Sequence, residues 1–146
     1  MCGEKNTGLG DHALNDNESG SENTAVGYYA MESNQCGDNN TATGYKALYN
    51  NTHGHDNVAT GHNALKDNHS NYNTAVGYQA LYTNTASYNT ALGYQAGYYN
   101  TTGSENVALG FGAYANSATA TGSYNVGWNI TTGTVSNGVS STLVSL

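Results

Sequence analysis

Histidines and an aspartate gather in one short stretch of the chain, which is where a metal ion would first be sought. The stretch reads His53-Gly54-His55-Asp56, and His69 follows one repeat later. Imidazole and carboxylate groups are common ligands of zinc and other transition metals in proteins. The two histidines lie in a glycine-containing turn, and no comparable position elsewhere in the chain repeats the pair. We therefore expect a solvated turn there, with no metal site and no cofactor.

Aromatic residues recur at two fixed positions of a repeated unit. The first position holds Tyr28, Tyr45, His62, Tyr78, Tyr94 and Phe111. Such a column could be a sugar-binding strip or could pack over the edge of the fold, and Phe111 favours packing because it has no hydroxyl. The second position holds Tyr49, Tyr82 and Tyr98 together with Glu32 and Lys66. Because charged residues share it, we predict that this second position is solvent-exposed and is the candidate for contact with a partner.

No set of catalytic residues stands out from the repeated background. A glycosidase needs two carboxylates that converge in a cleft, and nucleophilic catalysis needs a nucleophile beside a base. The carboxylates are scattered and never pair at repeated positions, so we predict no catalytic residues and no enzymatic activity. Calcium is not indicated either, since the chain lacks the Gly-Gly-x-Gly-x-Asp unit. An ice-binding surface would need Thr-x-Thr in most copies, but it occurs only at 41–43 and 119–121.

The residues above are positioned by a short tandem repeat. Its first strings are NTGLG, NTAVG, NTATG, NVATG, NTAVG, NTALG and NVALG, and they begin at Asn6, Asn23, Asn40, Asn57, Asn73, Asn89 and Asn106. The spacing is 16 or 17 residues, and a weaker copy lies at 118–122. Units of this length that cannot bury a core alone stack into solenoids. We predict an all-β solenoid, a single-chain parallel β-roll with one repeat per coil.

Each copy should contribute two short strands. The first has a period of two, in which Thr24, Val26 and Tyr28 share one face and Ala and Gly occupy the other. The second would be the Ala-Leu or Ala-Met pair that follows, as at Ala47-Leu48. The remaining Asn, Asp, Ser, Thr and Gly residues favour turns and would form the corners.

Composition and charge exclude several classes of partner. Only 37% of residues are hydrophobic, which rules out a large layered core, and the formal net charge is -7 with three lysines and no arginine. Binding to a phosphate backbone lacks the cations that would drive it, so we predict no nucleic acid partner. No apolar run approaches the roughly 18 residues of a membrane span, so we predict no membrane insertion.

The repeated N-[TV]-A-[VTL]-G unit resembles the N-S-V-A-I-G repeat of trimeric autotransporter adhesin heads. The full N-T-A-V-G-Y-x-A-L string is similar to arrays of phage and marine-microbial fibre proteins. The resemblance covers about residues 6–125 and implies a left-handed parallel β-roll that packs as a homotrimer. It differs in coil length, since the adhesin unit is nearer 14 residues, and no coiled-coil stalk or membrane anchor is recognisable.

Carried over residue by residue, the resemblance implies which face packs where. Val26, Val76, Leu92 and Leu109 would point into the roll. The alanines of the opposite face would pack against neighbouring chains: Ala25, Ala42, Ala59, Ala75, Ala91 and Ala108.

The chain divides into a repeat array at 1–125 and a C-terminal cap or transition segment at 126–146. The first coil lacks a polar cap, which indicates either a segment cut from a longer array or an end that docks on another subunit. We expect a structural and adhesive segment of an extracellular, cell-surface or virion fibre. The alternatives are a subunit of a self-assembling filament and a module that binds a cell-surface glycan or protein.

Overall fold

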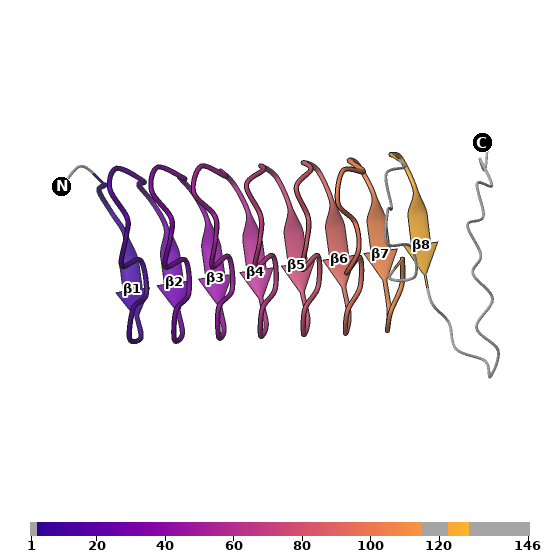
Figure 1. Ribbon diagram of the computed structural model, residues 1–146, viewed down its shortest axis with the longest axis horizontal. Coiled ribbons are helices and arrows are strands. Elements are labelled where there is room, and N and C mark those ends of the chain that lie inside the picture. Colours follow the sequence, from indigo (N-terminus) through magenta and orange to yellow (C-terminus); the bar gives the residue numbers. More distant parts are fainter. Residues whose placement is uncertain (1–2, 115–122, 129–146) are drawn as a thin grey trace.

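The fold is a stack of parallel coils, each of which adds one strand to a single sheet. The computed structural model describes residues 3–114 and 123–128, and these residues contain no helix. The strands are β1 (Thr7–Leu9), β2 (Thr24–Val26), β3 (Thr41–Thr43), β4 (Val58–Thr60), β5 (Thr74–Val76), β6 (Thr90–Leu92), β7 (Val107–Leu109) and β8 (Val126–Trp128). They lie side by side in chain order along an elongated rod (Figure 1). The all-β parallel solenoid predicted from the repeat is confirmed.

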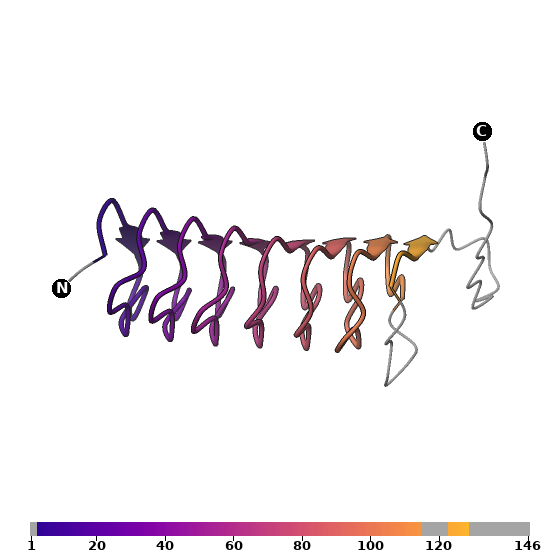
Figure 2. The same cartoon turned by 90° about the horizontal axis from the view of Figure 1, so that it is seen from above.

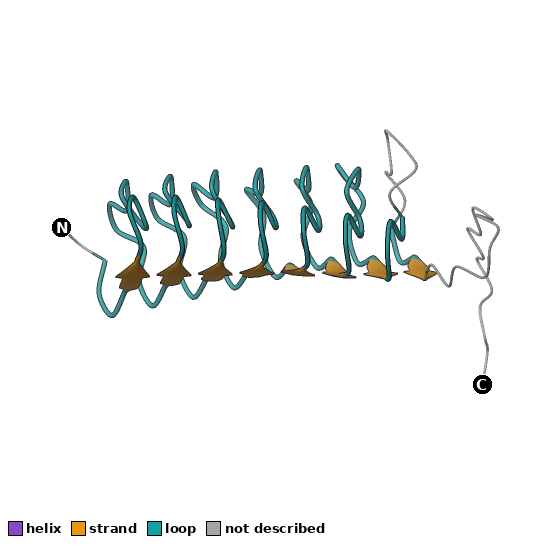
Figure 3. Cartoon of the chain, turned by 90° about the horizontal axis from the view of Figure 1, so that it is seen from below, coloured by secondary structure: helices purple, strands orange, loops and turns teal. Residues whose placement is uncertain are grey.

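The strands pair in the register of the repeat. Thr24 lies opposite Thr41, and Ala25 lies opposite Ala42. We number the coils 1 to 8 by the asparagines that begin them: Asn6, Asn23, Asn40, Asn57, Asn73, Asn89, Asn106 and Asn125. Every strand occupies one side of the stack, and the loops occupy the other (Figures 2 and 3). Like residues of successive coils therefore form columns along the rod.

The prediction of a second strand in each coil is wrong, because the Ala-Leu segment is a turn. In coil 3, Lys46 and Leu48 have φ of 52° and 51°, in the left-handed region that no β-strand uses. Their N–H groups point to opposite neighbours. That of Lys46 donates to the Tyr28 carbonyl at 3.0 Å, and that of Leu48 donates to the Ala64 carbonyl at 3.0 Å. Hydrogen bonds to both adjacent coils thus stabilise a costly backbone conformation.

The prediction of which strand face points inward is also wrong. The alanines Ala25, Ala42, Ala59, Ala75 and Ala91 are fully buried within the chain, and Ala108 is 3% exposed. The Thr and the Val or Leu on either side of each alanine point outward. The coil is too narrow for the larger residues: at Gly8, the alanine position of coil 1, a Cβ would already lie 3.3 Å from the Ala13 carbonyl oxygen. A valine inside would overlap the returning turn.

The apolar core is therefore a set of thin columns. One column is the strand alanines, and a second is formed by the turn alanines. The third is formed by the large side chains Met31, Leu48, Leu65 and Leu81. Each of coils 2 to 5 buries one large apolar side chain and two methyl groups, so its stability depends on its neighbours.

A glycine follows each of the strands β1 to β7, and where the next coil comes close to its α-carbon no larger residue fits. Gly44 has a φ of 130°, and a Cβ added there would lie 2.6 Å from the carbonyl oxygen of Gly61. No side chain fits that distance. The glycine column explains the invariant fifth residue of the repeat in this chain.

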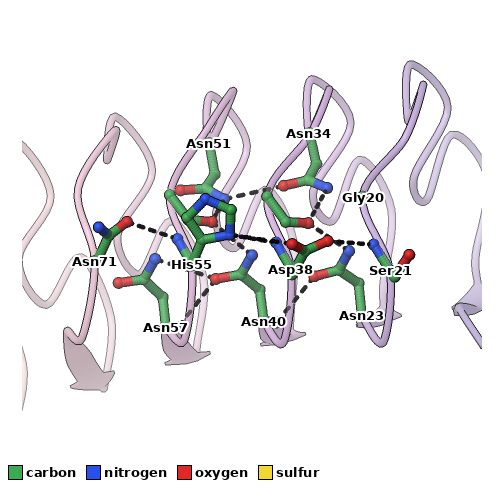
Figure 4. A network of polar contacts seen from close by, with 12 residues as sticks. Gly20, Ser21, Asn23, Asn34, Asp38, Asn40, Asn51, His55, Asn57 and Asn71 are labelled. Atoms are coloured by element: carbon green, nitrogen blue, oxygen red, sulfur yellow. Dashed lines mark hydrogen bonds and ion pairs between the residues drawn. The ribbon is translucent and has the colours of Figure 1, made fainter. Parts of the chain in front are cut away.

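Two columns of buried asparagines complete the interior, and the sequence analysis did not anticipate them. The first consists of the asparagines that begin the coils, of which Asn23 and Asn40 are fully buried. The second faces the first across the same loop. Asn51 Nδ2 donates to Asn34 Oδ1 at 3.0 Å and to the Gly54 carbonyl at 2.8 Å, which also accepts from Asn40 Nδ2. Figure 4 shows parts of both columns. These amides satisfy polar backbone groups that the thin apolar core cannot.

We predicted that the repeat array ends at residue 125. The sheet continues beyond this residue. β8 pairs with β7, with Val126 opposite Val107, and the Asn125 N–H donates to Asn106 Oδ1 at 2.9 Å. Asn125 thus takes the place of a coil-starting asparagine, although 19 residues separate it from Asn106. The weak copy at 118–122 lies outside the described residues, as does most of the segment 126–146.

Candidate functional site

The strand face is the largest regular surface of the rod. Its two columns of outward side chains are Thr7, Thr24, Thr41, Val58, Thr74, Thr90, Val107 and Val126, and Leu9, Val26, Thr43, Thr60, Val76, Leu92 and Leu109. Leu9 is 66% exposed, Leu92 is 52% exposed and Val126 is 55% exposed. None of these residues carries a charge. The face offers methyl groups at every strand and hydroxyls on β1 to β6, which suits burial against another repeating surface.

The first aromatic position forms a continuous stack beside the strand face. The ring centroids of Tyr45 and His62 lie 4.6 Å apart, and those of Tyr78 and Tyr94 lie 5.0 Å apart with planes 8° from parallel. The Phe111 ring continues the stack 5.0 Å from Tyr94. Each inner ring therefore covers the faces of its neighbours and leaves its edge exposed. Of the two alternatives left open by the sequence, this geometry favours packing, because a sugar ring stacks on an aromatic face.

The second aromatic position is half-buried rather than fully exposed. Tyr82 and Tyr98 stack at 5.1 Å with planes 2° from parallel. The ammonium group of Lys66 lies 5.2 Å from the Tyr82 centroid and 5.8 Å from that of Tyr49. The Lys46 ammonium lies 5.0 Å from the Tyr49 centroid. Cations over aromatic faces are attracted by the ring quadrupole, so Lys66 fills the place in the stack that lacks a tyrosine, and Lys46 contacts Tyr49 from a neighbouring position of the same coil.

Carboxylates and burial set the ionisation of these side chains. A hydrogen bond to Glu32 and then burial raise the pKa of Tyr49, and burial and then the nearby Tyr82 raise that of Tyr98. Burial acts to lower the pKa of Lys66, but its contact with Asp67 at 3.1 Å outweighs burial, and the net pKa is raised. The phenols are neutral and the lysine is charged at neutral pH.

A third aromatic pair was missed by the sequence analysis. Tyr72 and Tyr88 precede the asparagines that begin coils 5 and 6, and their rings stack at 5.0 Å with planes 9° from parallel. Both residues have left-handed φ, 58° and 63°. The signal was present in the sequence, since each tyrosine stands immediately before an Asn-Thr-Ala string.

The histidines do not converge on a metal site. His53 Nδ1 and His69 Nδ1 contact the Thr52 hydroxyl at 2.9 and 3.1 Å, whereas His55 Nδ1 accepts the N–H of Asp38 at 3.0 Å. The described part of the chain contains no group of three or more His, Cys, Asp or Glu side chains placed to hold a metal ion.

His55 instead belongs to a column of hydrogen-bond acceptors on the outer loops (Figure 4). The Ser21 N–H donates to Asp38 Oδ1 at 2.7 Å, and the His55 N–H donates to Asn71 Oδ1 at 2.8 Å. Each side chain in the column accepts the main-chain N–H of the coil before it. The changing residue types therefore share one structural role, in which an acceptor is all that is required.

Comparison with protein-family models, curated proteins and solved structures gives no match to this chain. The function must therefore be argued from the surfaces above. Within residues 3–114 and 123–128 there is also no helix with the length and apolarity of a membrane span.

Proposed function

We propose that this chain is a non-enzymatic structural and adhesive segment of an extracellular or virion fibre. In this proposal three copies of a left-handed coil pack side by side through their strand faces and hold an attachment surface away from its base. The resemblance of the repeat to adhesin heads and fibre arrays supports the chain number and the handedness.

The observation that carries the proposal is the uncharged strand face described above. It runs the length of eight strands, roughly 34 Å at about 4.8 Å per step. Its exposed apolar side chains, Leu9, Val58, Leu92 and Val126, are interspersed with threonines and with no charge, and apolar groups gathered on one exposed face favour an interaction site. The alanines, which we had assigned to contacts between chains, are sealed inside one coil and cannot serve this purpose.

The proposed face can be tested by light scattering coupled to size exclusion. Leu92→Lys with Val76→Lys should convert trimers to monomers, because three copies of each charge would be buried without partners. The control Thr102→Lys places the same charge on an exposed loop residue and should leave the trimer intact. A wild-type chain that stays monomeric at micromolar concentration would reject the proposal. Long filaments in electron micrographs would favour end-to-end assembly instead.

For attachment we propose the second aromatic position, at Tyr49, Tyr82 and Tyr98. The residue there changes from coil to coil, from Asn15 and Glu32 to tyrosine and lysine, so the repeat does not require one type for packing. The partner would be a glycan or protein of a cell surface that meets the edges and hydroxyls of these rings, because Tyr82 and Tyr98 cover each other's faces. A glycan array should show binding that the triple alanine variant loses, and an array without hits would remove the glycan.

A further inference from the structure

Coils 5 and 6 are joined by three tyrosine pairs, one in each aromatic column. The pairs are Tyr72–Tyr88, Tyr78–Tyr94 and Tyr82–Tyr98. Their centroid separations are 5.0, 5.0 and 5.1 Å, and their planes lie within 9° of parallel.

Other aromatic contacts among the described residues do not match this arrangement. Tyr28 and Tyr45 are 5.9 Å apart and tilted by 21°. Tyr98 and Tyr99 are close but adjacent in the chain, so a bond between them would join no coils. The interface between coils 5 and 6 is where phenols of different coils are most closely paired.

We propose that this interface is an oxidative cross-linking site, at which paired tyrosines couple to dityrosine and fasten coil 5 to coil 6. The proposal goes beyond the fibre function and does not depend on it. The co-reactant is a peroxide acting through a one-electron oxidant such as a haem peroxidase.

The chemistry balances without any other reagent. Each phenol loses one electron and one proton, and the two radicals form a carbon–carbon bond between the ring positions ortho to the hydroxyls. The coupled rings regain aromaticity when the proton on each bonded carbon moves to its oxygen. The two electrons and two protons that are released reduce one hydrogen peroxide to two waters.

Exposure and geometry favour the reaction within one chain. Tyr72 and Tyr88 are 50% and 56% exposed, and Tyr78 and Tyr94 are 41% and 44% exposed, so an oxidant can reach these rings. Exposed side chains can rotate about χ1 and χ2 from a stacked to an edge-linked arrangement. A partner held nearby has an effective concentration of at least about 1 mM, about 100-fold above a 10 µM solution of chains.

The test treats the full chain at about 10 µM with hydrogen peroxide and a haem peroxidase. The readouts are dityrosine fluorescence and tandem mass spectrometry, in which each link removes two hydrogen atoms. The test variant carries Tyr88→Phe, Tyr94→Phe and Tyr98→Phe, which keep the stacking rings as Phe111 does. The matched control carries Tyr28→Phe, Tyr45→Phe and Tyr124→Phe, which remove the same number of phenols elsewhere.

We expect the test variant to lose about tenfold or more of the intrachain dityrosine, in line with the lost effective concentration, and the control to lose less than twofold. Mixing isotope-labelled and unlabelled chains separates links within a chain from links between chains. When the wild-type chain is unfolded in urea, it should lose its preference for dityrosine links between coils 5 and 6. The urea sample shows what loss of folding alone does to the links, so a folding defect in the test variant can be recognised. Equal losses in the two variants, or links found only between chains, would overturn the proposal.

Discussion

The main-chain N–H of Asn40 donates to Asn23 Oδ1 at 2.9 Å, and both asparagine side chains are fully buried. The next coil repeats the relationship, since the Asn57 N–H donates to Asn40 Oδ1 at the same distance. Each asparagine also reaches across its own coil, as Asn23 Nδ2 does to the Gly37 carbonyl at 2.7 Å. One side chain thus joins two coils and makes a second contact within its own coil, so removal of any one amide should disturb more than its own position.

Removal of an amide from the second asparagine column should be costly. Asn51→Ala would leave Asn34 Oδ1 without its donor. It would also remove one of the two hydrogen bonds made by the Gly54 carbonyl and by Asn68 Nδ2. At about 1–3 kcal/mol for an unsatisfied buried group, we expect a loss of about 2 kcal/mol in the free energy of unfolding measured in urea. Asn15→Ala, which removes an exposed amide, should change it by less than about 0.5 kcal/mol. Equal effects would contradict a structural role for the column.

Two leucines provide a direct test of which strand and turn positions form the core. Leu48 is fully buried and Leu92 is 52% exposed. Leu48→Ala should lower the free energy of unfolding by about 2–5 kcal/mol, and Leu92→Ala by less than about 1 kcal/mol, in chains held monomeric by dilution. If Leu92→Ala proved the more costly, the inward assignment of the alanine face would be wrong.

A methyl group at the end of a strand should not be tolerated. Gly44→Ala places a Cβ 2.6 Å from the Gly61 carbonyl oxygen and imposes a φ of 130° that is strained for alanine. We expect the chain to lose coil-to-coil pairing there, seen as rapid amide hydrogen exchange in β3 and β4. Gly112→Ala is the control for the clash, because its φ of 59° also lies in the left-handed region but its Cβ would meet nothing within 4 Å. If the amides of β3 and β4 stayed protected from exchange in Gly44→Ala, coils 3 and 4 would be able to move apart at this position without losing their strand pairing.

High pH should weaken the fold through the tyrosines. The hydrogen bond to Glu32 raises the folded-state pKa of Tyr49 above its ordinary value of 10.0. The folded chain therefore holds this proton more tightly than the unfolded chain, so the stabilisation is complete below pH 10 and is lost as the pH rises through the raised pKa.

Ring-carbon NMR of labelled tyrosine can follow this titration site by site. Glu32→Gln should return the pKa of Tyr49 toward its ordinary value and leave Tyr124 unchanged. Glu105→Gln should do the reverse, because the hydrogen bond to Glu105 is the main cause of the raised pKa of Tyr124. If Glu32→Gln left the pKa of Tyr49 unchanged, the hydrogen bond to Glu32 would not be the cause of the raised pKa.

The sequence predicted the architecture because the string around Ala25 returns at Ala42 in the same order, and equal spacing implies stacked coils. It did not settle the inward face. A period of two separates Thr24 from Ala25 but is symmetric between inside and outside, and hydrophobicity alone favours Val26 as the buried residue. The width of the coil decides which face points inward, and this width is known only once the coil is seen closed in three dimensions.

The sequence did not predict the left-handed turn conformations or the columns of buried asparagines either. Lys46 and Leu48 adopt left-handed φ although neither is a residue that favours it, because carbonyls of the two adjacent coils accept their N–H groups. The Asn34–Asn51 ladder looks in sequence like ordinary turn composition. Such features depend on contact between residues one repeat apart, which propensity within a single repeat does not report.

The columns tolerate a change in coil length, since 16-residue and 17-residue coils keep every strand in register. Each coil contacts the coil before it and the coil after it through the same columns of residues. Whole repeats can therefore be removed or duplicated without creating a new kind of contact. Deleting residues 41–57 should place Val58 of coil 4 directly beside Thr24, where Thr41 now lies, and shorten the rod by about 4.8 Å. The molecule is in this sense a ruler, whose reach is set by copy number.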